Sequence, residues 1–288
     1  MSALGWLAQP GVLPWVVLLF GLCIGSFLNV VIHRLPKMLE REWRAECASL
    51  AGQEVPLAEP YNLFVPRSRC PSCGHKITAL ENVPLVSWAA LRGKCSSCKA
   101  PISGKYPLVE LLAGIAAGYS AWRFGPTLAT LGAALFVWFT IALAFIDQET
   151  GLLPDDLTLP LVWIGLLVNL WGAFVPIQDA MLGAVAGYLV LWLVYWAFKL
   201  LTGKEGMGFG DFKMNAAVGA FLGWKMLPMV ILLSSLVGLV FGAAQMFAAR
   251  GRYDGGFRFH FGPYIAIAGV IALFWGEPVM RWYLYRVG

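Results

Sequence analysis

Long apolar runs alternate with short polar stretches along most of this chain. Apolar runs of about 18 residues or more are long enough to cross a bilayer as helices. We expect about eight such spans, of which the sixth and the eighth are short and therefore broken or tilted. The spans are Pro10–Ile32, Leu108–Phe124, Pro126–Ile146, Leu157–Val175, Met181–Leu200, Phe212–Trp224, Met226–Ala249 and Gly262–Gly276.

The composition agrees with a chain embedded in lipid. Charged residues make up 13% of the 288 residues and hydrophobic residues 59%, whereas soluble domains carry roughly 25% charged residues. The first run is longer than a signal-peptide core, and no Lys or Arg precedes it, so we expect a retained helix. The predicted fold is an all-α polytopic membrane protein with about eight transmembrane helices.

One long polar stretch separates the first span from the others. We expect residues 1–32 to form the first transmembrane helix, residues 33–107 a loop domain, and residues 108–288 a second transmembrane domain that contains the remaining spans.

The distribution of basic residues predicts the orientation. With the N-terminus outside, loop 33–107 shares its side of the membrane with Arg250, Arg252 and Arg258. The opposite side keeps four of the 21 basic residues, namely Arg123, Lys225, Arg281 and Arg286. Because Lys and Arg favour cytoplasmic loops, we expect the loop domain to be cytoplasmic. The net charge of +5 then reflects a face beside anionic lipid and requires no nucleic-acid partner.

Four of the six cysteines form two close pairs in the loop domain. They read CPSC at Cys70–Cys73 and CSSC at Cys95–Cys98, with 21 residues between the pairs. This spacing is typical of a zinc site with four thiolate ligands, which is structural because no position is left for water. Disulfides, a redox pair or unligated thiols are the alternatives, although a reducing cytoplasm disfavours stable disulfides. We expect Cys23 and Cys47 to be inert.

Two aspartates lie at the edges of apolar runs. Asp147 ends the third span, in DQETGLLPDDLTLP, and Asp211 opens the sixth, in GMGFGDFKM. Two spans separate them, so the chain returns to the same membrane surface. Ionisable groups at the edge of the hydrocarbon are candidate functional residues. Two carboxyl groups that meet can share one proton, activate a water and protonate a leaving amine, which is the chemistry of peptide hydrolysis.

Several of these acids also have structural interpretations. Asp211 could cap the sixth helix, and Asp147 could be an interfacial charge. Asp155 and Asp156 are expected to cap the fourth helix. Glu110 is either a first-turn acid of the second span or a polar site residue.

Five stretches together resemble the bacterial type IV prepilin leader peptidases, which are also N-methyltransferases and belong to the Gly-x-Gly-Asp aspartic intramembrane peptidases. They are GLCIGSFLNVVIHRLP, CPSCGHKITALENVPLVSW, LRGKCSSCKAPISGKYPLVELL, DQETGLLPDDLTLP and GMGFGDFKM. The resemblance covers nearly the whole chain, in order. Gly-x-Gly-Asp alone is a weak motif, whereas its combination with two cysteine pairs is highly specific.

The resemblance implies an activity and a location. Such an enzyme cleaves the short basic leader from type IV prepilins and pseudopilins at the cytoplasmic face of the bacterial inner membrane. The family's paired catalytic aspartates fall on Asp147 and Asp211. The new N-terminal residue is then methylated with S-adenosylmethionine.

The resemblance also implies residues for the metal and for methyl transfer. Zinc ligands fall on Cys70, Cys73, Cys95 and Cys98. Residues linked to methylation fall in the same region, which points to Gly93 and Lys94. No glycine-rich cofactor fingerprint supports the methyl transfer independently.

Two other classes of function are possible readings of the same residues. The acids could be proton-relay groups of a small membrane transporter, which an inverted repeat would favour, but no internal symmetry is visible. A zinc-stapled scaffold of a secretion machinery is the second. The histidines His33, His75 and His260 have no obvious serine or cysteine partner. The sequence does not indicate an oligomeric state.

Overall fold

The computed structural model describes residues 11–53, 59–248 and 260–287 of the chain. Within these ranges the protein is helical and has no strand, only two isolated antiparallel bridges. This confirms the all-α fold class. The chain divides into two compact units, Met1–Pro126 and Thr127–Gly288. Arg250, Arg252 and Arg258, which support the predicted orientation, lie outside the described residues.

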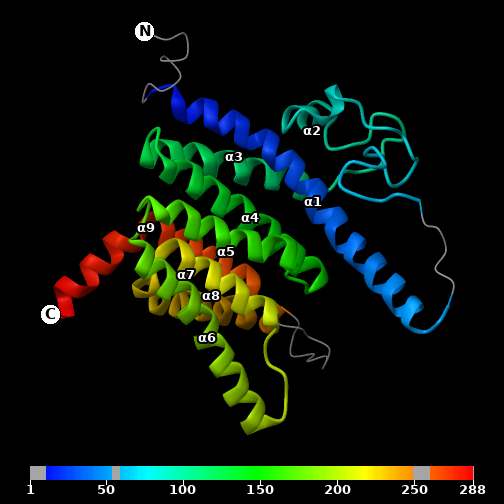
Figure 1. Ribbon diagram of the computed structural model, residues 1–288. Helices are drawn as coiled ribbons and strands as arrows, with labels where there is room; N and C mark the ends of the chain where they lie inside the picture. The colour runs from blue at the N-terminus through cyan, green and yellow to red at the C-terminus, as the bar shows by residue number, and fades with distance from the viewer. Residues whose placement is uncertain (1–10, 54–58, 249–259, 288) are drawn as a thin grey trace. The chain divides into compact units, whose positions relative to one another are not determined.

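The first unit is built on two long helices, α1 (Leu13–Leu50) and α3 (Lys105–Phe124) (Figure 1). Small residues line their contact and allow the backbones to approach closely. A Cβ atom on Gly25, for example, would lie 2.6 Å from the Cα atom of Glu110. Between the two helices the chain forms a loop that holds the short helices η1 (Leu80–Asn82) and α2 (Val86–Ala90) and both cysteine pairs.

Helix α1 continues well beyond the first predicted span. The span was expected to end at Ile32, but the helix runs on to Leu50 and includes Pro36. The added segment is rich in Glu, Arg, Leu and Ala, which have high helix propensity, and most of its side chains are exposed. It accounts for the first part of the stretch Leu39–Pro60, for which the sequence carries little signal.

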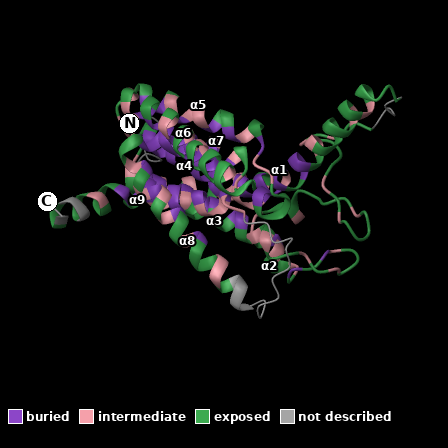
Figure 2. Cartoon of the chain, turned by 90° about the horizontal axis from the view of Figure 1, so that it is seen from below, coloured by how far each residue is buried: buried purple, intermediate pink, exposed green. Residues whose placement is uncertain are grey.

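The second unit is a helical bundle built around a short central helix. Its elements are α4 (Leu128–Thr150), α5 (Asp155–Leu170), α6 (Ile177–Thr202), α7 (Phe209–Leu222), η2 (Trp224–Met226), α8 (Leu227–Ala248) and α9 (Gly262–Val287). Helix α7 has 14 residues and packs against α5, α6, α8 and α9. All but three of its residues are buried, and Figure 2 shows the buried residues gathered where α4 and α7 lie.

Glycines and buried amides bind α7 to its neighbours. A Cβ on Gly183 of α6 would collide with the backbone of Gly219 of α7, and the reverse also holds. The Asn215 side chain donates a hydrogen bond to the carbonyl of Gly187 at 2.8 Å. From α5, Asn169 donates to the carbonyl of Ala220 at 2.9 Å. Small residues and interhelical amide bonds of this kind are typical of helices packed in a membrane.

Five helical segments are long and apolar enough to cross a membrane. They are Leu13–Leu50, Leu128–Thr150, Ile177–Thr202, Trp224–Ala244 and Gly262–Trp282. Each of the eight predicted spans coincides with a helix, but α3, α5 and α7 do not meet this standard, and α5 and α7 have only 16 and 14 residues. A multi-pass membrane protein is therefore supported, whereas the count of eight spans is not confirmed.

The division into compact units differs from the predicted regions at one boundary. The sequence assigns everything after residue 107 to the transmembrane domain. In the structure α3 packs on α1, and the division falls after Pro126. Where the functional domains begin and end stays a prediction.

The close contact of α6 and α7 predicts a strong effect of one substitution. Gly219→Leu would force a side chain into the backbone of Gly183, and we expect it to destabilise the fold by about 3 kcal/mol or more. Val185→Leu, on the exposed face of α6, is the control and should change stability by less than about 0.5 kcal/mol. Thermal unfolding of the purified protein in detergent measures both. Equal melting temperatures for the two variants would contradict this packing.

Candidate active site and candidate metal centre

Asp147 lies in the last turn of α4, where the helix ends. Gly151 follows in the left-handed conformation, and its N–H donates to the Asp147 carbonyl at 2.8 Å. The Asp147 side chain is 5% exposed, and its Oδ2 accepts the N–H of Gly262 at 3.1 Å. A Cβ on Gly262 would lie 2.7 Å from that oxygen. Only glycine therefore allows this contact with the first residue of α9.

Asp211 lies in the first turn of α7. Gly208 is the N-cap residue, and its N–H donates to Oδ2 of Asp211 at 3.3 Å. Asp211 is therefore not the N-cap residue that the sequence allowed. It lies three residues after the N-cap, and its side chain accepts the N–H of the N-cap residue. It is 6% exposed, and Oδ1 has no hydrogen-bond partner within the described residues.

The two aspartates lie at the same end of the second unit. Leu153, in the loop after α4, packs against the positions of both Gly210 and Gly262. The carboxylates of Asp147 and Asp211 are close enough to interact electrostatically. The end of α4 and the starts of α5, α7 and α9 thus meet, as two intervening helices require.

The acids that follow Asp147 do not cap α5. The N-cap residue is Pro154, and no side-chain capping bond forms. Asp155 and Asp156 instead occupy the first turn, where negative charge complements the helix dipole. Lys213 donates to Asp155 at 2.6 Å and so joins the starts of α5 and α7.

His260 is a neighbour of the aspartates that the sequence did not reveal. A Cβ on Gly151 would lie 3.5 Å from its Nε2 atom, and the imidazole interacts electrostatically with Asp147. The residues are more than 100 positions apart in the chain. The one available signal was the position of His260 just before the last apolar run.

The first unit gathers the four paired cysteines into one cluster. Their sulfur atoms all lie within 4.8 Å of one another, and Sγ of Cys70 is 3.8 Å from Sγ of Cys98. Tetrahedral zinc with Zn–S bonds of about 2.3 Å places its sulfur ligands roughly 3.8 Å apart. None of the four forms a disulfide. The donor set and its spacing therefore fit a metal ion.

The two cysteine pairs sit on turns of the same geometry. The N–H of Cys70 donates to His75 and that of Cys95 to Ala100, each spanning five residues. A second bond in each turn runs to the first cysteine carbonyl, from Gly74 at 2.9 Å and from Lys99 at 3.1 Å. Gly74 and Lys99 both have positive φ, at 73° and 61°.

Backbone hydrogen bonds bias the ionisation of the thiols. The N–H groups of Cys73 and Ser72 lower the pKa of Cys70 to about 6. The N–H of Ala100 lowers the pKa of Cys98, but hydrogen bonds with the other thiols and burial outweigh it and raise that pKa to about 11. Since the thiolate is the metal-binding form, Cys70 is prepared for coordination, and loading the remaining thiols releases protons.

Gly93 and Lys94 precede the second cysteine turn. Gly93 has φ of 67°, and a Cβ there would lie 3.0 Å from the Trp88 ring. The backbone of Lys94 forms an isolated bridge with Pro101. Glu110 is buried in the second turn of α3 and accepts the N–H of Leu85 at 2.8 Å, so it is not a first-turn acid.

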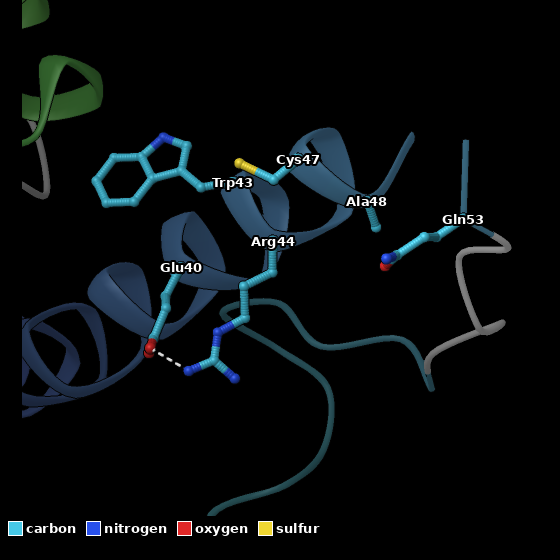
Figure 3. A pocket seen from close by; sticks show the side chains of 6 residues that line it. All are labelled: Glu40, Trp43, Arg44, Cys47, Ala48 and Gln53. Atoms are coloured by element: carbon cyan, nitrogen blue, oxygen red, sulfur yellow. Dashed lines mark hydrogen bonds and ion pairs between the residues drawn. The ribbon is translucent and has the colours of Figure 1, made fainter. Parts of the chain in front are cut away.

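The two remaining cysteines, Cys23 and Cys47, are exposed and unpaired in disulfides. Cys47 borders a shallow hollow on the α1 extension (Figure 3). The charged side chains there, Glu40 and Arg44, pair with each other at 2.6 Å. Nothing in this hollow points to a ligand.

Comparison with known proteins assigns the chain to a family. The model of the "Type IV leader peptidase family" matches residues 134–243, and that of the "Bacterial Peptidase A24 N-terminal domain" matches residues 19–124. The chain therefore belongs to the type IV leader peptidase family. No solved structure matches it.

Its relatives carry one name. A "Prepilin leader peptidase/N-methyltransferase" of Aeromonas salmonicida (strain A449) is 58% identical over 282 residues, which cover 96% of each chain. The protein of that name from Pseudomonas aeruginosa is 51% identical over 290 residues, 100% of this chain and 99% of the relative. Because the matched family is a peptidase family, the transporter alternative has no support.

The two cysteine turns have the same geometry but differ in the residue at positive φ, which is Gly74 in one turn and Lys99 in the other. Replacing each of these residues by alanine should therefore affect metal binding differently. Gly74→Ala places a side chain at positive φ, which costs about 1–2 kcal/mol, so the zinc-loaded protein should lose metal roughly tenfold faster. Lys99 already has a side chain at the matching position of the other turn, and Lys99→Ala removes only its exposed hydrogen bond to the Ser96 carbonyl at 2.9 Å, so this substitution should change the rate less. Transfer of zinc to a chromophoric chelator measures both rates. A faster loss from Lys99→Ala than from Gly74→Ala would refute the equivalence.

Proposed function

We propose that this chain is a bifunctional enzyme of the bacterial inner membrane that removes the leader of type IV prepilins and pseudopilins and then methylates the new N-terminus. Asp147 and Asp211 would be the catalytic pair, facing the cytoplasm. The observation that carries this proposal is the presence of two buried, electrostatically interacting carboxylates at one end of the bundle, one of which accepts the Gly262 N–H. The names of the close relatives support the activity.

Burial and mutual proximity determine what the pair can do. Two buried carboxylates that interact electrostatically favour a state in which the pair holds one proton. The charged carboxylate takes a proton from a water molecule while that water attacks the peptide carbonyl. The protonated carboxyl group of the pair gives its proton to the carbonyl oxygen. Return of a proton to the amide nitrogen then releases the amine. The Gly262 N–H orients Asp147, whereas Oδ1 of Asp211 keeps its hydrogen-bonding capacity for water or substrate.

The cysteine cluster would hold a structural zinc ion. Four thiolates complete the coordination, so the metal would act on the fold of the loop and not on the peptide bond. A loop with so little apolar core needs such a staple. Methylation would use S-adenosylmethionine as the donor, and the bilayer itself is the medium in which the substrate helix is presented.

Replacement of either aspartate tests the peptidase. We expect Asp147→Asn and Asp211→Asn each to lower kcat for prepilin cleavage by about 100- to 10,000-fold or more, because the pair then lacks its acid or its base. Glu277→Gln, an exposed carboxyl-to-amide change on α9, is the matched control and should cleave normally. The measurement is the cleavage of purified prepilin in detergent. Substantial turnover by either aspartate variant would exclude this mechanism.

Loss of the metal tests the structural role of the cysteines. Metal analysis of the wild-type protein should find about one zinc ion for each chain, and Cys95→Ser should abolish it. Leader cleavage should persist in this variant, since the aspartates do not depend on the metal chemically. Complete loss of cleavage in a folded Cys95→Ser protein would show that zinc does more than hold the loop.

A further inference from the structure

A cavity of about 540 Å³ lies within the first unit. Small-molecule sites occupy roughly 300–1,000 Å³. Helix α1 lines the cavity with Ser26, Asn29 and His33, which recur at the three- and four-residue spacing of one helix face. The start of α3 and the loop with the cysteine pairs provide the other walls.

Two buried side chains of opposite charge line this cavity. Arg34 is 8% exposed and Glu110 is 9% exposed. In the part of the chain that the structure describes, no ion pair joins them. Arg34 uses Nη1 to bind the carbonyls of Asn62 and Leu63, at 2.9 and 3.4 Å, which leaves Nε and Nη2 for a ligand. Glu110 accepts the N–H of Leu85 at 2.8 Å, which is a neutral donor. Because buried charges are costly without a charge partner, each side chain favours a ligand group of the opposite charge.

A third buried polar group in the cavity wall, the Asn29 side chain, has an acceptor without a hydrogen-bond donor within the described residues. Asn29 is 7% exposed, and its amide nitrogen donates to the carbonyl of Tyr106 at 3.0 Å. Its carbonyl oxygen is buried and has no hydrogen-bond partner within the described residues. A buried acceptor without a partner costs about 1–3 kcal/mol. A donor or a cation in the cavity would remove this cost.

Aromatic rings form another part of the wall. Tyr61 and Trp88 both line the cavity. The indole N–H of Trp88 donates to the carbonyl of Ile102 at 3.3 Å, and Gly93 packs against the ring. On Tyr61, the guanidinium of Arg41 lies 4.1 Å from the ring centroid. Rings held in this way suit stacking with a flat heterocycle.

We propose that this cavity binds S-adenosylmethionine, an inference that rests on the methyl transfer proposed above. Arg34 would bind the carboxylate of its amino-acid part. Glu110 and the Asn29 carbonyl oxygen would face the ammonium and sulfonium cations, and Trp88 or Tyr61 would stack on the adenine. S-adenosylmethionine combines an anion, cations and a flat heterocycle, and the cavity offers a basic, an acidic and an aromatic side chain to match them.

The same assignment gives Gly93 a role that differs from ligand contact. Neither Gly93 nor Lys94 lines the cavity. A side chain at Gly93 would press on Trp88, so Gly93 acts as a positioning residue for that ring. Lys94 acts through its backbone bridge to Pro101.

The chemistry of the transfer provides a specific test for Glu110. The S–CH₃ bond breaks with its electron pair left on sulfur, an N–CH₃ bond forms, and the amine loses a proton. The product S-adenosylhomocysteine therefore keeps the carboxylate and the ammonium but has a neutral sulfur. A carboxylate near the sulfonium distinguishes the two molecules, whereas Arg34 does not.

Equilibrium dialysis of the purified full-length protein with radiolabelled S-adenosylmethionine and S-adenosylhomocysteine tests this assignment. We expect Arg34→Gln to weaken the binding of both by about tenfold or more, the effect of losing a charged hydrogen-bonding partner. Glu110→Gln should weaken binding of the methyl donor at least several-fold more than binding of the product. The controls Arg44→Gln and Glu40→Gln make the same chemical changes at the exposed pair in Figure 3 and should leave both affinities unchanged.

The possible results distinguish a wrong location of the donor site from a wrong assignment of the methyltransferase function. Wild-type affinity in both Arg34→Gln and Glu110→Gln would overturn the site. A wild-type protein that binds no donor and methylates no prepilin would instead overturn the methyltransferase function. Prepilin cleavage by each variant reports that it is folded.

Photochemical crosslinking of the radiolabelled donor to the wild-type protein avoids any effect of substitution on folding. Peptide mapping should find the label in segments that contain Tyr61 or Trp88. Label confined to residues 127–287 would overturn the proposed site.

Discussion

A short helix buried on nearly every side is the constraint on which the second unit depends. The 14 residues of α7 span about 21 Å, less than the roughly 30 Å of hydrocarbon in a bilayer. A helix of this length cannot face lipid along its side and still reach both surfaces, so its neighbours must surround it. The packing that buries α7 therefore also buries Asp211, which lies in its first turn. Asn169 and Asn215 fix the helix in that position by interhelical hydrogen bonds.

The second acid, Asp147, is held at the same end of the bundle by a different set of contacts. The end of α4 brings Asp147 to the same end of the bundle, and the backbone of Gly262 holds it there. Since the close contact excludes any side chain at position 262, the orientation of Asp147 is a property of the backbone and not of a flexible partner. Rigid elements on all sides are what a pair of reacting groups needs for accurate placement.

Patterns that are local in sequence predicted most of the fold. Apolar runs identified the long helices, and α9 starts at Gly262, the predicted first residue of the last span. The cysteine spacing predicted the thiol cluster. The extension of α1 to Leu50 was not predicted, because the prediction relied on apolar runs and this segment is polar, although it is rich in helix-forming residues. The last span was predicted to end at Gly276, yet α9 continues through Glu277 and Pro278 to Val287.

Apart from the shared surface of the two aspartates and the pairing of the cysteines, contacts between distant residues could not be predicted. Nothing in the local sequence joins Gly262 to Asp147 across 115 positions, or His260 to Gly151. Asn29 and Arg34 lie in one of the stretches that carry the resemblance and Glu110 lies in another, but the sequence gives no sign that the two stretches face one cavity. Only the packing of α1 on α3 and the return of the loop place them in one cavity.

The length of α1 has a mechanical consequence. Its 38 residues make one rod of about 57 Å, nearly twice the thickness of the hydrocarbon. An unbroken helix transmits rotation and tilt from end to end, so a small change in the inclination of its apolar half swings the far tip through several ångströms. Asn29 and Arg34 lie near the middle of the helix, where a tilt about its centre produces the least displacement.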